Sequence, residues 1–131
     1  MGDCCWLSMR VLPSQKKRWI EEFDFTDEEF NIEDGYLTLE THDANYAWGD
    51  MRNEAAKAGL VFSGEHSTGG DYDAYAFCAV GGKEYVVSTS AHAGVSVPCP
   101  KGGPLEKDLA LVAEYWNMLE GIDGIMEKES E

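Results

Sequence analysis

The chain has 131 residues, 44% of them apolar, which suits one domain with a hydrophobic core. Its 25 Asp and Glu residues outnumber 10 Lys and Arg, which gives a formal charge of −15 at pH 7. This excess disfavours direct binding to nucleic acid or to an anionic membrane, because both would be repelled, but it is compatible with a basic protein partner.

The first predicted elements are a strand, a helix and a helical turn. Apolar and polar residues alternate over residues 6–12, as expected of a strand with one buried face. Ser14 is then expected to cap a helix, and Thr26 to cap a short turn over residues 27–30. The core stripe expected for the helix is Trp19, Ile20 and Phe23.

A second strand and helix follow. Residues 36–41 alternate cleanly and predict a strand. Asp43 or Asn45 is expected to open the next helix, and Gly59 suits the position just past its end. The residues expected to face the core from this helix are Trp48, Met51, Ala55 and Ala58.

Three strands are predicted in the next part of the chain. Residues 60–63 form the first, and the glycine-rich stretch 64–70 is expected to be a loop whose glycines take positive φ. Residues 72–80 and 84–89 form the other two strands. Gly81-Gly82 between them is typical of a tight hairpin turn.

The C-terminal part is predicted to be irregular and then helical. Residues 91–104 are rich in Pro and Gly, and Pro104 suits the first turn of a helix. Residues 126–131 are charged and are expected to fray. The predicted core stripe of this helix is Leu105, Leu109, Val112, Trp116 and Leu119.

The predicted element order is therefore β-α-β-α-β-β-β-α in a single domain over residues 1–131. A mainly antiparallel sheet with helices on one face is the natural packing of such an order. The sequence thus predicts an α+β two-layer sandwich of ferredoxin-like type.

Several stretches resemble small ferredoxin-like proteins that bacteriophages, plasmids and prophages carry. They are residues 5–11 (CWLSMRV), 44–46 (ANY), 58–66 (AGLVFSGEH) and 69–72 (GGDY), all within the first 90 residues. The resemblance implies a fold and a mobile-element origin, and it implies no catalytic residue. Anti-CRISPR-type counter-defence proteins are similar by analogy, since many are also small, acidic and compact.

A block of acids forms the first candidate site. Residues 21–43 contain Asp and Glu but no Lys or Arg, and repulsion among them costs stability. Docking on a basic groove that normally holds nucleic acid could offset that cost, because a line of carboxylates imitates phosphate charge. The alternative is a solvated, solubilising face. The predicted partner-binding residues are Glu21, Glu22, Asp24, Asp27, Glu28, Glu29, Glu33 and Asp34.

The glycine-rich loop over residues 64–73 is the second candidate. It lacks a Walker A lysine and the acid spacing of an EF-hand, so turn chemistry is its simplest interpretation. A ligand- or metal-binding domain, or a small enzyme, could still use it. Its candidate ligand residues are Glu65, His66, Asp71 and Tyr72.

Other reactive side chains show no site pattern. His42, His66 and His92 could meet around zinc, but their spacing does not require it. A Cys99–His92 pair has no third group to orient it. We therefore predict no catalytic residue, no metal site and no cofactor, and we expect Cys78 to be buried as a small hydrophobe.

The sequence favours a small acidic, non-catalytic binding protein. It would block a basic, nucleic-acid-binding surface of a protein or nucleoprotein complex, as a mobile-element inhibitor or as an immunity protein against a nuclease toxin. No export signal or long apolar segment is present, so we expect a cytoplasmic protein, in the host cell if phage-encoded. A homodimer through an edge strand is a further possibility.

Overall fold

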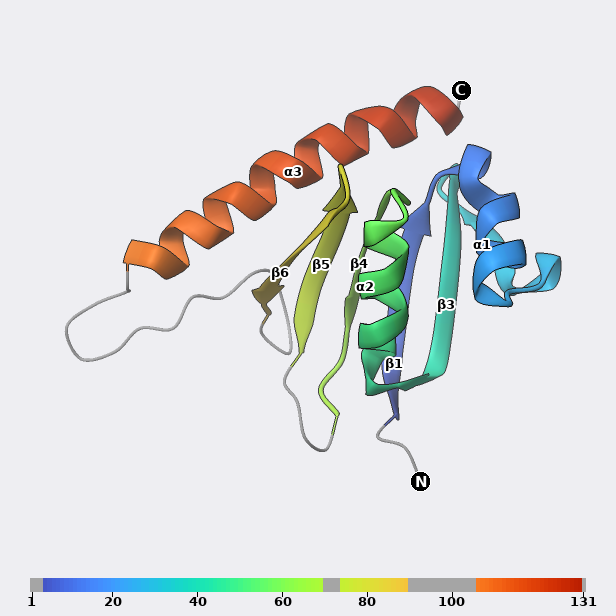
Figure 1. Cartoon of the computed structure of the whole chain (residues 1–131), viewed down its shortest axis with the longest axis horizontal. Helices are drawn as coiled ribbons and strands as arrows, with labels where there is room; N and C mark the ends of the chain where they lie inside the picture. Colours follow the sequence, from blue (N-terminus) through green and yellow to red (C-terminus); the bar gives the residue numbers. More distant parts are fainter. Residues whose placement is uncertain (1–3, 70–73, 90–105, 131) are drawn as a thin grey trace.

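The computed structural model describes residues 4–69, 74–89 and 106–130, with the side chains of 108 and 130 left out. Within these residues, six strands form one antiparallel sheet in the order β2-β3-β1-β4-β5-β6 (Figure 1). The strands are β1 (Cys4–Val11), β2 (Phe30–Glu33), β3 (Tyr36–Asn45), β4 (Phe62–His66), β5 (Tyr75–Val80) and β6 (Lys83–Ser88). The α-helices are α1 (Lys16–Phe23), α2 (Gly49–Lys57) and α3 (Glu106–Ser130). An α+β fold with an antiparallel sheet is confirmed.

One face of the sheet is covered by α1 and α2. The alternating residues Leu7, Met9 and Val11 of β1 are buried there, as predicted. Trp19 of α1 is also fully buried, and its ring contacts that of Phe62 with 5.7 Å between centroids. Aromatic packing therefore fixes α1 on the centre of the sheet.

The other face is covered by α3, so the prediction of helices on one face is wrong. Tyr115 of α3 lies in one buried cluster with Ala76 and Cys78 of β5. The neighbouring β5 residues Phe77 and Ala79 belong to the core beneath α2. A continuous apolar run supplies both faces of one strand, and the layering is helix–sheet–helix rather than two layers.

The buried stripe of α3 differs from the predicted one. Leu109 and Trp116 are 50% and 46% exposed, whereas Tyr115, Ile122 and Met126 are buried. The first turns of α3 extend past β6, beyond the sheet that would cover them (Figure 1). At the other end, the helix continues to Ser130 through the tail expected to fray.

The β2–β3 hairpin contains a strand that the sequence analysis left out. A 3₁₀ turn, η2 (Asp27–Glu29), follows Thr26 as predicted, and β2 then pairs with β3. Asp34 and Gly35 have φ of 51° and 84°, the left-handed pair that a tight hairpin needs. Gly81 and Gly82 have positive φ in the predicted β5–β6 turn as well.

The helix expected to open at Asp43 or Asn45 begins later, at Gly49. β3 continues to Asn45, where Cys4 of β1 pairs with it beyond a register shift between Cys5 and Leu7. Tyr46, Ala47 and Trp48 then have φ of 51–54°, a left-handed turn rare for residues other than glycine. The turn redirects the chain from the sheet edge into α2.

Candidate functional site

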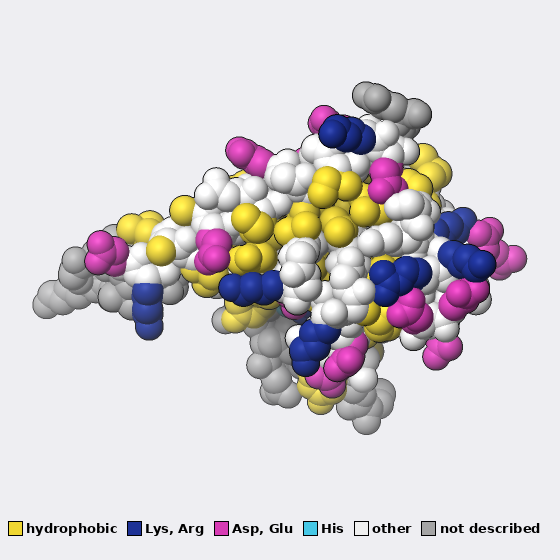
Figure 2. All heavy atoms as spheres, turned by 45° about the horizontal axis from the view of Figure 1, so that its top comes forward, with side chains coloured by type: hydrophobic (Ala, Val, Ile, Leu, Met, Phe, Trp, Pro, Cys, Tyr) yellow, Lys and Arg dark blue, Asp and Glu magenta, His cyan; other side chains and the backbone are white. Residues whose placement is uncertain are grey.

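The eight predicted partner-binding carboxylates, called the acid block from here on, are all exposed. They lie on α1, on η2, on β2 and in the β2–β3 turn. Basic side chains from residues 16–18 stand among them, and Figure 2 shows blue and magenta groups side by side at one end of the molecule. The surface is therefore acidic overall but partly neutralised.

Three members of the acid block are held by these bases. Lys16 pairs with Asp27 at 2.5 Å, Lys17 with Glu21 at 3.8 Å, and Arg18 with Glu22 at 2.8 Å. The Arg18 side chain lowers the pKa of Glu22 by hydrogen bonding. These contacts reduce the charge that the three carboxylates offer a partner.

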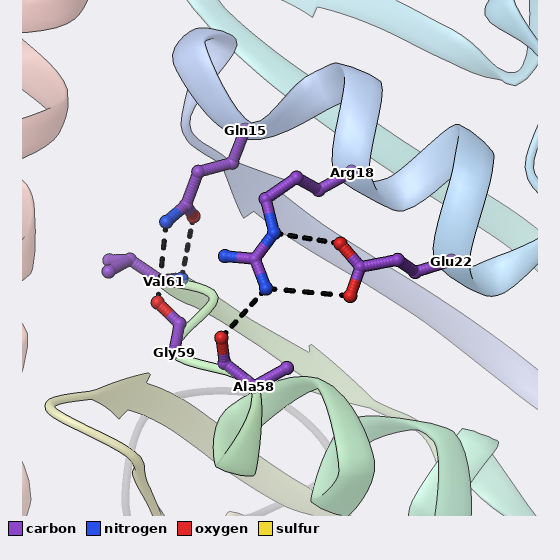
Figure 3. A network of polar contacts seen from close by, with 6 residues as sticks. All are labelled: Gln15, Arg18, Glu22, Ala58, Gly59 and Val61. Atoms are coloured by element: carbon purple, nitrogen blue, oxygen red, sulfur yellow. Dashed lines mark hydrogen bonds and ion pairs between the residues drawn. The ribbon is translucent and has the colours of Figure 1, made fainter.

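Arg18 also has a structural role, which Figure 3 shows. Its Nη2 donates to the carbonyl oxygen of Ala58 at 2.8 Å while Nε donates to Glu22. Gln15 beside it donates to Gly59 O and accepts from Val61 N–H at 2.8 Å. This network, called the α1 clamp, ties α1 to the turn between α2 and β4, and Glu22 belongs to it.

Of the remaining five members of the acid block, one caps a helical turn and four have no such partner among the described residues. Glu29 accepts the backbone N–H of Thr26 at 3.0 Å and so caps η2. Within the described residues, Asp24, Glu28, Glu33 and Asp34 have no ion pair or side-chain hydrogen bond. These four are the carboxylates most available to a ligand.

Glu33 and Asp34 also border a cleft of about 350 Å³ between α3 and the polar part of the sheet, called the α3 cleft. Strands β1, β3 and β4 form its floor, the β2–β3 turn forms one border, and α3 forms a wall. Its lining residues are Ser8, Met9, Arg10, Glu33, Asp34, Thr38, Ser63, Gly64, Glu65, Ala76, Tyr115, Leu119 and Asp123. No local sequence pattern indicates this cleft, because its residues come from distant segments.

The α3 cleft has a negative lining. Glu33, Asp34, Glu65 and Asp123 oppose one base, Arg10, whose guanidinium lies 4.2 Å above the Tyr36 ring centroid. Burial raises the pKa of Asp123; Arg10 acts in the opposite direction, and Glu127 and Glu120 raise it further. The balance of charge favours a positively charged group.

Two buried hydroxyls line the same cleft. Ser63 and Tyr115 are 6% and 4% exposed, and neither hydroxyl has a hydrogen-bond partner among the described residues. Trp19 Nε1 is the buried side-chain atom of the described residues that is shielded from solvent and has no hydrogen-bond partner. The two hydroxyl oxygens are therefore not sealed from solvent. The pKa of Tyr115 is raised to about 12, mainly by burial and then by the charges of Cys78, Glu65 and Asp123.

Gly64 is a strand residue rather than the start of a loop. It pairs with Met9, and a Cβ placed on it would collide with Ser8 O and stand 2.6 Å from Met9 Cβ. Its φ is not positive, so the expectation of a glycine-rich loop beginning here is wrong. Glycine is needed because β1 and β4 approach closely.

The predicted ligand residues of that loop do not form one site. Glu65 and His66 are successive residues of β4, so they point to opposite faces, Glu65 toward the α3 cleft. His66 is buried beside Phe77 and Tyr75, and its Nδ1–H donates to Ser67 O at 2.9 Å. Burial lowers its pKa. Asp71 and Tyr72 lie outside the described residues.

Metal and thiol sites gain no support from the described residues. Among them, no three His, Cys, Asp or Glu side chains are grouped so that they could hold a metal ion. His42 is exposed and His66 is buried, while His92 and Cys99 lie outside the described residues. Cys78 is fully buried as predicted, and burial raises its pKa to about 12, so the thiol is unreactive.

The structure also contains a largely buried ion pair that no local sequence pattern predicts. Arg52 of α2 pairs with Glu84 of β6 at 2.5 Å, and its guanidinium lies 4.2 Å above the Phe77 ring centroid. Arg52 Nε also donates to Ala47 O. The pair joins α2 to the edge of the sheet and is a structural contact.

Comparisons with known proteins give no relative. No helix in the described part of the chain has the length and apolar character that a membrane span requires. No family model, no curated protein and no solved structure matches the chain.

Proposed function

We propose that the chain is a small acidic, non-catalytic binding protein that covers a basic, nucleic-acid-binding surface of a protein or nucleoprotein complex. The supporting observation is the position of Glu33 and Asp34. They belong both to the exposed acid block and to the border of the α3 cleft. A basic partner could therefore be attracted by the exposed acids and held at the cleft.

Electrostatics favours the hypothesis of a binding protein over that of an enzyme. Opposite charge speeds encounter and sets orientation, and its effect weakens as salt screens it. The available carboxylates are Asp24, Glu28, Glu33 and Asp34 rather than the whole acid block, since ion pairs and a cap occupy the others. The interface proposed here is thus narrower than the one predicted from the sequence.

The form we favour is a mobile-element inhibitor of host defence, and an immunity protein against a nuclease toxin fits the same physics. We infer that residues 4–66 are a ferredoxin-like unit, because the order β1-α1-β2-β3-α2-β4 is the split βαβ arrangement. The motif resemblance, the size and the charge support the mobile-element form.

The experiment is capture of partners from a host lysate on the immobilised chain, followed by purification of a retained nucleic-acid-binding protein. Its affinity is compared for Asp24→Asn with Glu28→Lys and for a matched control, Glu114→Gln with Glu54→Lys. Both double variants change the net charge equally, and all four positions are exposed. Asn tolerates the left-handed backbone of Asp24, whose φ is 61°.

The proposal predicts that the acid-block variant weakens binding about tenfold, while the control changes it less than about twofold. Salt and added nucleic acid should both release the wild-type complex. Equal affinity for the two variants, or a complex that resists salt and nucleic acid, would contradict it.

A further inference from the structure

The α3 cleft has a shape and a lining that suit one chemical class of ligand. At about 350 Å³ it lies within the size range of small-ligand pockets, and it is open on one side to solvent. Its floor carries Ser8, Arg10, Thr38 and Ser63 side by side on adjacent strands. Its wall is the sheet-facing side of α3, which contributes Tyr115, Leu119 and Asp123 to the lining.

Charge restricts the class of ligand. Four carboxylates come from three separate places, namely the β2–β3 turn, β4 and α3, and one guanidinium lies among them. An anionic ligand would meet a net negative lining. A compact metal ion would need three close ligands, and no such group exists among the described residues. An extended organic cation can contact acids that are spread around the cleft.

The buried hydroxyls provide an independent indication of a ligand. Ser63 is 6% exposed and lies on the same face as Arg10, its cross-strand partner, so its side chain points into the cleft. Its hydroxyl has no partner within the described residues, and buried polar groups are normally hydrogen-bonded. A donor entering the cleft would satisfy it.

We propose that the α3 cleft binds a guanidinium or alkylammonium group, held by Asp123 and Glu65 and hydrogen-bonded by Ser63. A guanidinium is planar and carries several donors, so it can contact carboxylates and a hydroxyl together. Arg10 lying above Tyr36 shows that the cleft border already accommodates such a group. That the bound group belongs to an Arg or Lys side chain of a partner rests on the proposed function. The preference of the cleft for such a group does not rest on it.

The test is a titration of the full chain with butylguanidinium near physiological ionic strength, followed by amide NMR shifts. N-butylurea serves as the neutral analogue of the same shape. The chain is compared with Asp123→Asn, Glu65→Gln and Ser63→Ala, and with Glu54→Gln as the control. Glu54 is an exposed acid of α2 outside both the acid block and the cleft, so its variant changes charge but not the lining.

The proposal predicts saturable shifts centred on residues 63–65 and 115–123. Asp123→Asn and Glu65→Gln should each weaken binding about three- to tenfold, and Ser63→Ala about threefold. Glu65→Gln changes an exposed side chain, so folding does not obscure its result. Shifts of equal size with butylurea, an equal loss in Glu54→Gln, or no saturation would overturn the proposal.

A peptide pair then separates the two sources of the group. Acetyl-Gly-Arg-Gly-amide is compared with the same peptide containing citrulline, the neutral analogue of Arg. Tighter binding of the Arg peptide than of butylguanidinium supports a protein side chain as the ligand. Binding of butylguanidinium alone supports a free cation at the cleft and counts against the proposed function, so the two failures are distinguishable.

Discussion

Gly64 is the residue whose identity the strand packing restricts most directly. A Cβ there would meet backbone atoms of Ser8 and Met9, so the strands would have to separate. We expect Gly64→Ala to destabilise the protein by about 1–3 kcal/mol, the usual cost of overpacking. Chemical denaturation measures this free energy of unfolding.

The matched control is Gly121→Ala, at an exposed position of α3 where a Cβ would meet nothing within 4 Å. Alanine is the better helix former, so this change should stabilise by up to about 1 kcal/mol. A neutral Gly64→Ala would show that β1 and β4 are not held as closely as described.

His66 gives the protein a predictable response to pH. Burial lowers its pKa below the ordinary 6.5, the hydrogen bond to Ser67 acts in the opposite direction, and Arg52 lowers it further. The folded state therefore binds fewer protons than the unfolded state. The contribution of neutral His66 to the free energy of unfolding is fully present above pH 6.5. It falls as the pH drops through the pKa of His66 in the unfolded state toward its lower pKa in the folded state.

We expect His66→Phe to flatten the slope of unfolding free energy against pH between about 6.5 and 5. Phenylalanine keeps the ring beside Phe77 and cannot be protonated. His42→Phe, at an exposed position, is the matched control for replacing an imidazole with a phenyl ring. An unaltered slope in His66→Phe would assign the acid sensitivity to other groups.

At the scale of elements, the Arg52–Glu84 pair connects α2 to the edge strand β6. The Arg52 side chain is buried and that of Glu84 is mostly buried, with 7% and 15% exposure, so removing one leaves the other without its countercharge. We expect Arg52→Met to cost about 3 kcal/mol, and the double variant Arg52→Met with Glu84→Leu to recover much of it.

The pH dependence of that loss is a second test of the same pair. Burial raises the pKa of Glu84, and Arg52 acts in the opposite direction. Without Arg52, Glu84 should protonate more readily, so the loss should shrink as the pH is lowered into the acidic range. A loss of the same size at all pH values would show that packing, rather than charge, holds α2 on β6.

The elements that sequence reasoning found are those with long or sharply marked patterns. The alternation in β1, the stripe of α1 and the Gly81-Gly82 turn are all local, and the structure contains each of them. β2 has four residues, too few for alternation to stand out, although Asp34-Gly35 could have indicated its turn.

The facing of α3 and the layer count depend on tertiary contacts. One apolar stripe of α3 contains Leu109 and Trp116, which are exposed. The neighbouring stripe on the helix surface contains Tyr115, Ile122 and Met126, which are buried. Only the position of the sheet decides which stripe is buried. The apolar run in β5 did indicate burial on both faces, and it was the available evidence for a second helical layer.

For the whole molecule, the sequence predicted where acids concentrate but not which of them are available. The spacing of Arg18 and Glu22 by four residues predicts an ion pair on a helix. The pairing of Lys16 with Asp27 and the placement of Glu65 and Asp123 around one cleft require the folded chain. The α3 cleft therefore appears only in three dimensions.

The measurement that tests the central claim most directly is an amide NMR map of the chain titrated with an arginine-rich peptide near physiological ionic strength. We expect saturable shifts concentrated on residues 28–35 and on the α3 cleft, which weaken as salt is added. Shifts spread evenly over the exposed acids of α2 and of the first half of α3 would contradict it, because net charge alone would then explain the binding.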